Sequence, residues 1–282
     1  MSPRRLAIIV ATYNRPDALA AVLRGLAAQT DRGFEVIVAD DGSRDETRDT
    51  VNALRAGFPV TLKHVWHPDG GFRLAAIRNK GILTADADYL VFLDGDCIPQ
   101  PDFVARHHAL AASGRMVTGS RILLGESLTA RLLADGTDFF SLGTLRRLAE
   151  RRRGGINKLL PLWIKVPAGV HRHVDRFVWR RIKGCNLAAW RDDVLAINGF
   201  DESFTGWGHE DADFVLRLFH AGVRRTDGAY ATEVLHLWHR EAKKDSATSN
   251  LETVKHRMAT RLVRAERGLD ELRQAGELWR VD

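Results

Sequence analysis

Cysteine is scarce in this chain, which has two cysteines among 282 residues. Cys97 and Cys185 are too few for a disulfide framework, and their spacing matches no zinc-binding motif. A chain of this kind suits a reducing compartment, where disulfides are rare. We therefore expect the protein to work in the cytoplasm.

Long apolar segments are also lacking. No stretch approaches the roughly 20 apolar residues that a membrane-spanning helix needs. The first apolar run, residues 6–11, follows basic residues but soon ends in a polar Thr-Tyr-Asn-Arg sequence. A signal peptide needs a longer apolar region and a cleavage site of small residues. We therefore interpret this run as a first buried strand.

The balance of charge is positive, with a formal net charge of +6 at pH 7. Hydrophobic residues make up 45% and charged residues 28% of the chain, an ordinary globular composition that allows one large domain or two small ones. A positive charge indicates anionic partners such as nucleotides, phospholipid surfaces or nucleic acid. No recognised nucleic-acid-binding module is present, so we expect no nucleic-acid partner.

The clearest local pattern is an apolar run that ends in two acidic residues. Residues 90–93 predict a buried strand, and Asp94-Gly95-Asp96 follows it directly. Hard cations such as Mg²⁺ and Mn²⁺ prefer oxygen ligands and are often held by one or two carboxylates and the phosphates of a substrate. The pattern predicts a metal site, and a solvated turn is the alternative for this tripeptide taken alone.

Strands and helices alternate along the first part of the chain. The predicted strands cover residues 6–11, 34–39 and 60–65, and the predicted helices cover residues 18–28, capped by Asp17, and a segment from Ser43 or Asp45 to Leu54. This alternation predicts a mostly parallel α/β sheet. The polar segments 12–15, 40–41 and 94–96 then end at one edge, where open α/β sheets bind ligands.

A glycine-rich loop, residues 67–73, precedes a predicted helix over residues 74–81. Gly70 and Gly71 allow the backbone to approach a ligand closely. Arg73 and Arg78 are candidates for phosphate contacts, because a guanidinium group binds phosphate oxygens in a bidentate manner. The alternative is that both arginines lie on an exposed helix surface.

Several motifs in this order resemble those of a known family. They are ATYNRP (11–16), VADDGS (38–43), GGFRLAAIRNKGI (70–82), LDGDC (93–97) and, later, GWGHED (206–211). The first four are similar to family 2 glycosyltransferases with the nucleotide-sugar-binding GT-A fold. The last resembles a segment that β-1,4-galactosyltransferases share with bacterial chondroitin-polymerase-type transferases. The likeness extends over residues 6–240, and residues 120–183 match it poorly.

The resemblance implies a binding site for a UDP-sugar. The nucleoside pocket would be lined by Thr12, Tyr13, Asn14 and Arg15. Asp41 would bond the uracil ring, Arg78 would contact the donor phosphate or sugar, and Asp94 would contact the ribose or the metal. We expect Gly184 and Asn186 to border the donor sugar and Trp207 to offer an apolar platform for a sugar ring.

The resemblance also implies a catalytic and a metal-binding group. Asp211 would be the general base, and Glu210 would hold hydroxyls of the acceptor or donor. Asp96 would bind Mn²⁺ or Mg²⁺, with His239 as the first and His236 as the second choice for a further ligand. Two residues at this spacing lie on opposite faces of a regular strand, so at most one would bind the metal. For Glu210 and Asp211 the alternative is acidic charge at a helix N-terminus, which the helix dipole favours. For His236 and His239 the alternative is two histidines on the surface.

The middle and the end of the chain are predicted from composition. Residues 144–183 contain twelve Lys or Arg residues against two acids, interleaved with Trp and Leu, which favours peripheral contact with an anionic membrane and a lipid-linked acceptor. A solvated basic loop is the alternative.

Residues 249–272 have the periodicity of one long amphipathic helix, with Ser249 and Glu252 as a capping box. We expect a GT-A domain over residues 1–240, with 120–183 as a variable acceptor-side region, and a helical tail over 241–282.

These observations predict an inverting, metal-dependent glycosyltransferase. It would move a hexose or N-acetylhexosamine from a UDP-sugar to a glycan or a lipid-linked glycan. One alternative is a sugar-nucleotide nucleotidyltransferase, which would need a basic glycine-rich signature where the chain instead has residues 12–16, TYNRP. The other is a non-catalytic protein that binds glycan or nucleic acid, which would not need Asp96, Asp211 and a histidine together.

Overall fold

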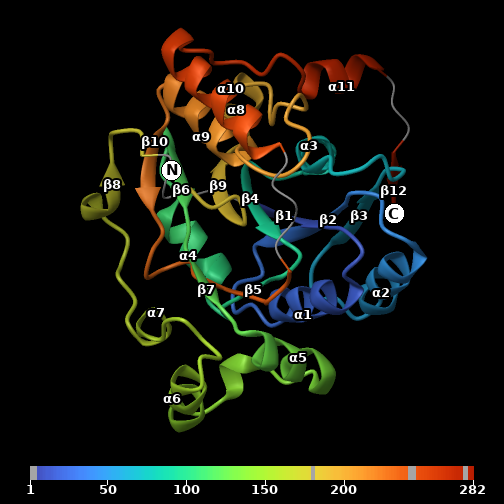
Figure 1. Ribbon diagram of the computed structural model, residues 1–282, viewed down its shortest axis with the longest axis vertical. Coiled ribbons are helices and arrows are strands. Elements are labelled where there is room, and N and C mark those ends of the chain that lie inside the picture. The colour runs from blue at the N-terminus through green and yellow to red at the C-terminus, as the bar shows by residue number, and fades with distance from the viewer. Residues whose placement is uncertain (1–4, 179–181, 241–245, 276–278) are drawn as a thin grey trace.

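The computed structural model describes residues 5–178, 182–240, 246–275 and 279–282 and has a mixed α/β architecture (Figure 1). Within these residues, a nine-stranded sheet has the order β12-β3-β2-β1-β4-β9-β6-β10-β8. Its strands are β1 (Leu6–Thr12), β2 (Phe34–Asp40), β3 (Leu62–Trp66), β4 (Tyr89–Asp94), β6 (Arg115–Thr118), β8 (His173–Val174), β9 (Asn186–Trp190), β10 (Arg224–Asp227) and β12 (Arg280–Val281). A three-stranded sheet contains β5 (Cys97–Pro99), β11 (Val234–His236) and β7 (Arg121–Leu123).

Helices cover both faces of the large sheet. They are α1 (Pro16–Ala27), α2 (Asp45–Arg55), α3 (Leu74–Thr84), α4 (Phe103–Leu110), α5 (Glu126–Asp135), α6 (Thr144–Arg152), α7 (Leu160–Trp163), α8 (Arg191–Ala196), α9 (Glu210–His220), α10 (Ala247–Thr260) and α11 (Leu269–Ala275), with short 3-10 turns at Phe139–Ser141 and Val170–Arg172. Helices α5 and α6 extend away from the sheet (Figure 1). None of the described helices is long and apolar enough to cross a membrane.

The predicted parallel sheet is confirmed in the first half of the chain. Strand β1 pairs in parallel with β2 on one side and with β4 on the other, and β2 pairs in parallel with β3. In this register Thr12 is opposite Asp40, and Ala11 is opposite Asp94. The polar segments that follow these strands therefore emerge at one edge, as the sequence predicts.

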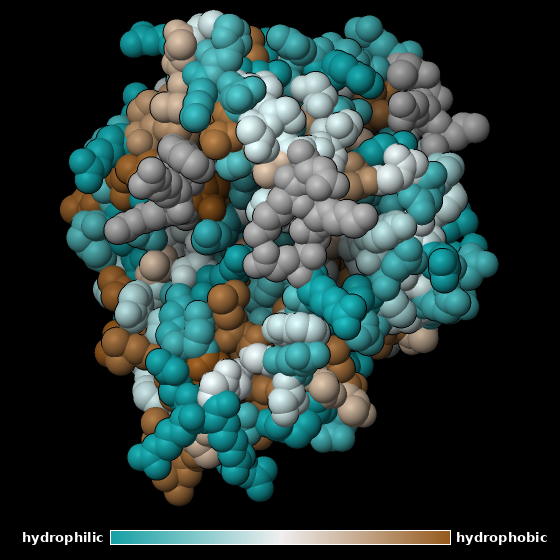
Figure 2. All heavy atoms as spheres, viewed as in Figure 1, coloured by the Kyte–Doolittle hydropathy of each residue, from teal (hydrophilic) through white to brown (hydrophobic). Residues whose placement is uncertain are grey.

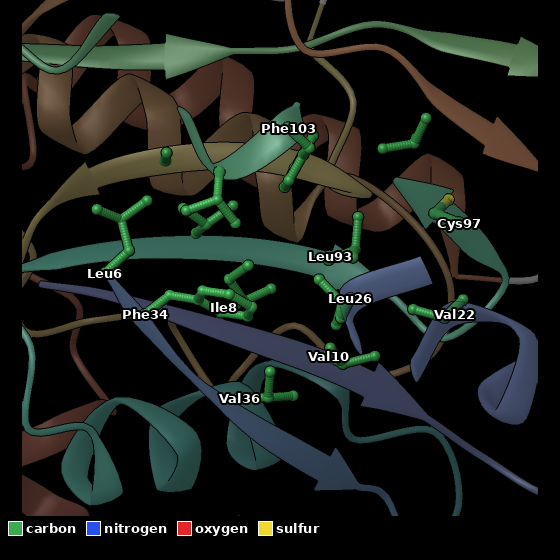
Figure 3. Packing of buried hydrophobic residues seen from close by; sticks show 14 of the residues in the cluster. Leu6, Ile8, Val10, Val22, Leu26, Phe34, Val36, Leu93, Cys97 and Phe103 are labelled. Carbon is green, nitrogen blue, oxygen red and sulfur yellow. The ribbon is translucent and has the colours of Figure 1, made fainter. Parts of the chain in front are cut away.

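Side chains alternate between the two faces of each strand, and each face has its own hydrophobic core. On one face, Ile8 and Val10 of β1 pack with Val22 and Leu26 of α1 (Figure 3). On the other face, Ile9 belongs to a second cluster that includes residues of α3, α8 and α9. Strands buried on both faces are nearly continuous apolar runs, which is why the sequence identifies them.

The second half of the chain enters the sheet by antiparallel pairing. Strand β9 lies between β4 and β6 and is antiparallel to β4. Strand β11 pairs antiparallel with β5, which directly follows the Asp-Gly-Asp turn, and its last residue, His236, is opposite Cys97. Segments more than 130 residues further along the chain are thereby brought to the edge that carries the acidic residues.

Three details differ from the predictions. Helix α1 begins at Pro16 with Arg15 at the N-cap, so Asp17 lies inside the first turn and does not cap the helix, and the proline supplies the helical start. The predicted helix over residues 249–272 is wrong as one element. It consists of α10 and α11, and the chain turns between them at Arg261, which has a left-handed conformation (φ 54°). Ser249 lies inside α10, not at its N-cap, so the proposed capping box is also wrong.

Candidate active site

The Asp-Gly-Asp segment forms a tight turn against the end of β1. The backbone N–H of Gly95 donates a 2.7 Å hydrogen bond to the carbonyl oxygen of Ala11. A Cβ atom at position 95 would lie 2.9 Å from that oxygen and 3.1 Å from the Thr12 side chain, so only glycine fits without displacement. The turn thus places Asp94 and Asp96 beside the carboxyl end of β1.

Three potential metal ligands gather at this turn. Asp96, His236 and His239 each offer one ligand atom, and these atoms lie within 4.8 Å of one another. Oδ2 of Asp96 lies 3.2 Å from Nε2 of His239 and 3.8 Å from Nε2 of His236. One carboxylate and two imidazoles form a donor set that suits Mn²⁺ and other first-row divalent cations. The residues present therefore fit a divalent metal.

Both histidines belong to the group of potential metal ligands because the strand ends between them. The expectation that at most one could face the site assumed a regular strand, but β11 ends at His236 and the chain then turns. Nδ1 of His239 lies 2.8 Å from the carbonyl oxygen of Arg240, to which it donates, so Nε2 keeps its lone pair for a ligand. Burial lowers the pKa of His236, which keeps that imidazole in the neutral form that binds metals.

Arg78 lies at the centre of the site and not on the surface. Its side chain is 1% exposed, and Nη2 donates to Oδ1 of Asp94 at 2.9 Å and to the carbonyl oxygen of Gly184 at 3.2 Å. Nη1 lies 3.4 Å from Oε1 of Glu210. The guanidinium group also stacks 5.2 Å from the ring centroid of Phe200. The surface alternative is therefore wrong for Arg78, which joins the acidic turn to helix α9.

Glu210 and Asp211 form the first turn of α9. Burial, together with the neighbouring charge of Asp211, raises the pKa of Glu210 to about 7 despite the opposing effect of Arg78. Oδ2 of Asp211 accepts a 2.8 Å hydrogen bond from the backbone N–H of Gly184. Glu210 thus contacts Arg78 directly, and Asp211 and Arg78 both bond the backbone of Gly184.

The segment before β9 supports these acids from behind. A Cβ atom on Gly184 would lie 3.1 Å from the Asp211 side chain, which explains the glycine. Asn186 is fully buried, and its amide nitrogen donates to the carbonyl oxygens of Ser120 and Thr232. The predicted contact of Asn186 with a donor sugar gains no support from this position, because its side chain joins neighbouring strands.

The four residues predicted to line a nucleoside pocket are the last residue of β1 and the three that follow it. Thr12 is buried, whereas Tyr13 is 49% exposed and its hydroxyl donates to Asp69 at 3.0 Å. The backbone N–H of Asn14, a residue with a left-handed conformation (φ 48°), donates to Ser43 after β2. Arg15 forms an ion pair with Asp17. The loops after β1, β2 and β3 therefore meet at this end of the site.

Asp41 lies beside these loops and is 5% exposed. Its Oδ1 lies 2.7 Å from Nε2 of His67, and its Oδ2 accepts a 2.8 Å hydrogen bond from the backbone N–H of Arg73. The side chain of Arg73 turns back to the carbonyl oxygen of Pro68. The glycine-rich loop is thus closed onto the end of β2.

Trp207 is 41% exposed and belongs to a loop of unusual backbone conformation. Gly206, Gly208 and His209 all have positive φ angles, of 73°, 108° and 70°. Helix α10 contacts this loop, because the side-chain amide of Asn250 donates to the carbonyl oxygen of Gly208 at 2.9 Å. The loop precedes α9, so its conformation sets where the helix and its two acids begin.

Two groups of supporting residues were missed by the sequence interpretation. His67 and Lys80 lie behind Asp41, and Arg257 of α10 binds Asp201 and Asp213 at 2.8 and 2.9 Å. The buried lysine and arginine stand in polar stretches that resemble ordinary exposed helix surface. No local pattern distinguishes such residues, because their partners are distant in the sequence.

Two family models and several curated proteins are similar in sequence to this chain. The family model for glycosyl transferase family 2 matches residues 7–166, and the model described as the N-terminal domain of galactosyltransferase matches residues 171–242. Validoxylamine A glucosyltransferase of Streptomyces hygroscopicus subsp. jinggangensis is 33% identical over 230 residues, which cover 78% of this chain and 53% of that protein. Chondroitin synthase of Escherichia coli is 31% identical over 242 residues, covering 80% of this chain and 34% of that protein. The chain thus spans about half or less of the length of these relatives.

Solved structures show the same fold. S. aureus TarS superimposes with a TM-score of 0.58 at 16% identity, covering 95% of this chain and 41% of that chain. The mannosyltransferase PcManGT from Pyrobaculum calidifontis superimposes with a TM-score of 0.56 at 16% identity, covering 99% of this chain and 77% of that chain. These similarities confirm the predicted GT-A fold. The family 2 model matches more than half of this chain, so the chain belongs to the family 2 glycosyltransferases.

Proposed function

We propose that this enzyme is an inverting, metal-dependent glycosyltransferase that moves a hexose or N-acetylhexosamine from a UDP-sugar to a glycan or lipid-linked glycan. The observation that carries the proposal is the joint position of two groups. Asp96, His236 and His239 offer ligand atoms within 4.8 Å of one another, and Arg78 joins the adjacent Asp94 to Glu210 of α9. This arrangement supports a site in which a metal held by the first group and the acid pair of α9 act on the same donor.

The metal would be held by Asp96, His236 and His239, and Mn²⁺ or Mg²⁺ is the expected ion. When bound, such an ion stabilises the negative charge of a departing nucleoside diphosphate. The solved structure of PcManGT contains GDP-Man and Mn²⁺, and TarS has been solved with UDP and with UDP-GlcNAc. These complexes support a divalent metal and a nucleotide-sugar donor for this chain, and Asp41 is the residue we expect to recognise the base.

Asp211 is the proposed general base. Its Oδ2 is held by the Gly184 N–H, which fixes the direction in which the carboxylate faces. In an inverting transfer, the acceptor hydroxyl attacks the anomeric carbon from the face opposite to the leaving group, and the base removes the hydroxyl proton. Glu210, next to it, would hold acceptor or donor hydroxyls, and Trp207 would stack against a sugar ring.

Membership of a glycosyltransferase family disfavours the two alternative functions, a nucleotidyltransferase and a non-catalytic binding protein.

The first experiment is hydrolysis of a panel of UDP-sugars with Mn²⁺ present or absent, read as released UDP. Transferases often hydrolyse their donor slowly when no acceptor is present, so no acceptor needs to be known. We expect metal-dependent release from one sugar and loss of that release in Asp96→Ala. His236→Ala and His239→Ala should each increase the Mn²⁺ concentration needed for half-maximal rate, by roughly 10-fold or more.

The matched control for these variants is His171→Ala, which removes an exposed histidine outside the metal cluster. It should leave both the rate and the Mn²⁺ requirement unchanged. If no UDP-sugar is bound or hydrolysed, the donor class is wrong. If hydrolysis is equally fast in a chelator, the metal dependence is wrong.

The acceptor and membrane part of the proposal is based on residues 144–183, of which 179–181 lie outside the described residues. Helix α6 is strongly basic, and its one acid, Glu150, is already paired with Arg131 and Arg153. Leu145 of the same helix is 83% exposed, and Leu148 is 40% exposed. Figure 2 shows hydrophilic and hydrophobic residues intermixed on the protrusion where Figure 1 places α5 and α6. Uncompensated arginines beside exposed leucines suit an anionic bilayer, and we expect a peripheral contact on the cytoplasmic face.

Sedimentation with vesicles tests this contact. We expect binding to vesicles that contain anionic phosphatidylglycerol and little binding to neutral phosphatidylcholine vesicles. Leu145→Ser with Leu148→Ser should weaken binding several-fold at a salt concentration where charge alone is screened. Equal binding by the variant would show that the leucines do not contribute to the contact. If the wild type does not bind the anionic vesicles, the membrane proposal is wrong.

A further inference from the structure

A buried chain of polar side chains lies behind Asp41. Nζ of Lys80 lies 3.0 Å from Nδ1 of His67, and Nε2 of His67 lies 2.7 Å from Oδ1 of Asp41. Lys80 and His67 are each 1% exposed. The three residues come from the segments after β2 and β3 and from helix α3. None of the chemistry proposed above uses the lysine or the histidine.

The order of donors along this chain follows from the chemistry of the lysine. An ammonium group has three N–H donors and no acceptor, so Lys80 donates to Nδ1 of His67. Nδ1 must then be the ring nitrogen without a proton, and the N–H of the neutral imidazole lies on Nε2. That N–H points to Oδ1 of Asp41. Lys80 therefore selects the tautomer in which His67 is a donor to the carboxylate.

This arrangement fixes what Asp41 can recognise. Its Oδ1 accepts from His67 and its Oδ2 accepts from the backbone N–H of Arg73, so the plane of the carboxylate is held from two sides. The lone pairs that remain can accept a hydrogen bond from a ligand. A base with a ring N–H, such as uracil, supplies that donor, whereas the corresponding ring nitrogen of cytosine is itself an acceptor and is repelled.

We infer that Lys80 and His67 are positioning residues that hold Asp41 as an acceptor for a nucleotide base with a ring N–H, so that the enzyme distinguishes UDP from CDP. The inference rests on the proposed function, because it assumes that Asp41 faces the base of the donor. It adds two residues to the determinants of nucleotide specificity. Neither residue touches the donor, and both act through the carboxylate.

The carboxyl-terminal residues 279–282 support this chain from the far side. The ring of Trp279 lies with its centroid 5.8 Å from Nζ of Lys80. Strand β12 extends β3 at its edge, with Arg280 opposite Trp66, the residue directly before His67. An aromatic face stabilises a buried ammonium group and keeps water from it. Residues 279–282 thus help to hold the polar chain behind Asp41 in place.

The test measures affinity for UDP and CDP by calorimetry and donor hydrolysis at varied UDP-sugar concentration. In the wild type we expect UDP to bind more tightly than CDP. Lys80→Met should reduce UDP affinity by about tenfold and change CDP affinity by less than about twofold. The KM for the donor should rise by a similar factor, while kcat at saturating donor stays within about twofold.

A rescue variant separates positioning from general damage. In the double variant Lys80→Met with His67→Gln, the glutamine amide supplies an N–H near the position of Nε2 without any choice of tautomer. It should recover most of the preference for UDP. Lys63→Met is the matched control, because Lys63 on β3 forms its ion pairs with Glu35 and Asp86, away from the polar chain behind Asp41. It should change the melting temperature but not the ratio of the two affinities.

A second pair of variants tests the inference if Lys80→Met does not fold. His67→Gln should keep the preference for UDP, and His67→Leu should lose it. An unchanged ratio of UDP to CDP affinity in folded His67→Leu or folded Lys80→Met would overturn this inference alone. If the wild type binds UDP and CDP equally, Asp41 does not read the base. If it binds neither, the proposed donor class fails as well.

Discussion

The two sides of the active site are built in different ways. The proposed nucleotide side consists of loops that follow adjacent parallel strands, and backbone pairing such as Thr12 opposite Asp40 holds it in register. The acidic side consists of helix α9 and the loop before it, which are held by buried ion pairs and side-chain contacts from α10. The first side depends on a local βαβ pattern. The second depends on particular side chains that are distant in the sequence, so single substitutions should affect it more.

The largest expected effect is on catalysis by Asp211. Asp211→Asn keeps the size of the side chain but removes the proposed base, and we expect turnover to fall by about 10³-fold. UDP affinity should change by less than about twofold, because the nucleotide side is untouched. Initial rates and calorimetry measure the two quantities. Asp192→Asn, an exposed acid in the first turn of α8, is the control, and full activity of Asp211→Asn would refute the assignment of the base.

The next largest expected effect is on stability, through the ion pairs that hold α9. Arg257 is almost fully buried and binds Asp201 and Asp213, both of which lack exposed side-chain surface. Arg257→Met leaves two buried carboxylates without this partner, and we expect a loss of about 3–5 kcal/mol in the free energy of unfolding. Chemical denaturation measures it. Arg264→Met breaks an exposed pair with Asp270 and should cost less than about 1 kcal/mol.

A third test uses the pKa of Glu210, which is raised to about 7 in the folded protein. Between pH 4.5 and 7 the folded state holds a proton at Glu210 that the unfolded chain releases. This group's contribution to stability is therefore present at low pH and is lost as pH rises through 7. We expect Glu210→Gln to reduce the fall in unfolding free energy between pH 5 and 8 by roughly 2 kcal/mol. An identical pH profile in the variant would contradict the proposed proton.

The smallest effect concerns the loop that carries Trp207. Asn250→Ala removes the hydrogen bond to the carbonyl oxygen of Gly208, and we expect a loss of about 1 kcal/mol in stability and a several-fold rise in the KM for the donor. Steady-state kinetics detect this change. Thr253→Ala on the same helix removes a hydrogen bond to Ser249 and should leave the KM unchanged. Equal KM values for both variants would show that α10 does not set the loop.

The sequence predicted the parallel strands and their common edge well because the signals for them are local. The apolar runs of β1, β2 and β4 and the polar residues after them gave both the elements and their common edge. The metal group was predicted only in part. Asp96 follows an evident strand, but the joint position of His236 and His239 depends on where β11 ends, which periodicity does not show.

The sequence interpretation was open or wrong where tertiary contacts replace local patterns. For Arg78 it left a phosphate contact and an exposed helix surface as alternatives, and the burial of Arg78 between Asp94 and Glu210 excludes the exposed surface. The carboxyl-terminal stripe resembles one helix, yet the chain turns at Arg261 and then forms a second helix. For Arg78 the cost of burial is offset by partners that lie far along the chain, and a single sequence contains no sign of which partners meet.

The sequence by itself determined the α/β class, the parallel strands and the acidic edge at which they end. Apolar periodicity and turn residues act over short distances, so they can be recognised without knowing the fold. Only the tertiary structure decided that both histidines join Asp96, that Arg78 and Arg257 are buried, and that Lys80 supports Asp41. Those arrangements are set by antiparallel pairing and by the requirement that buried polar groups find partners, and both depend on the whole fold.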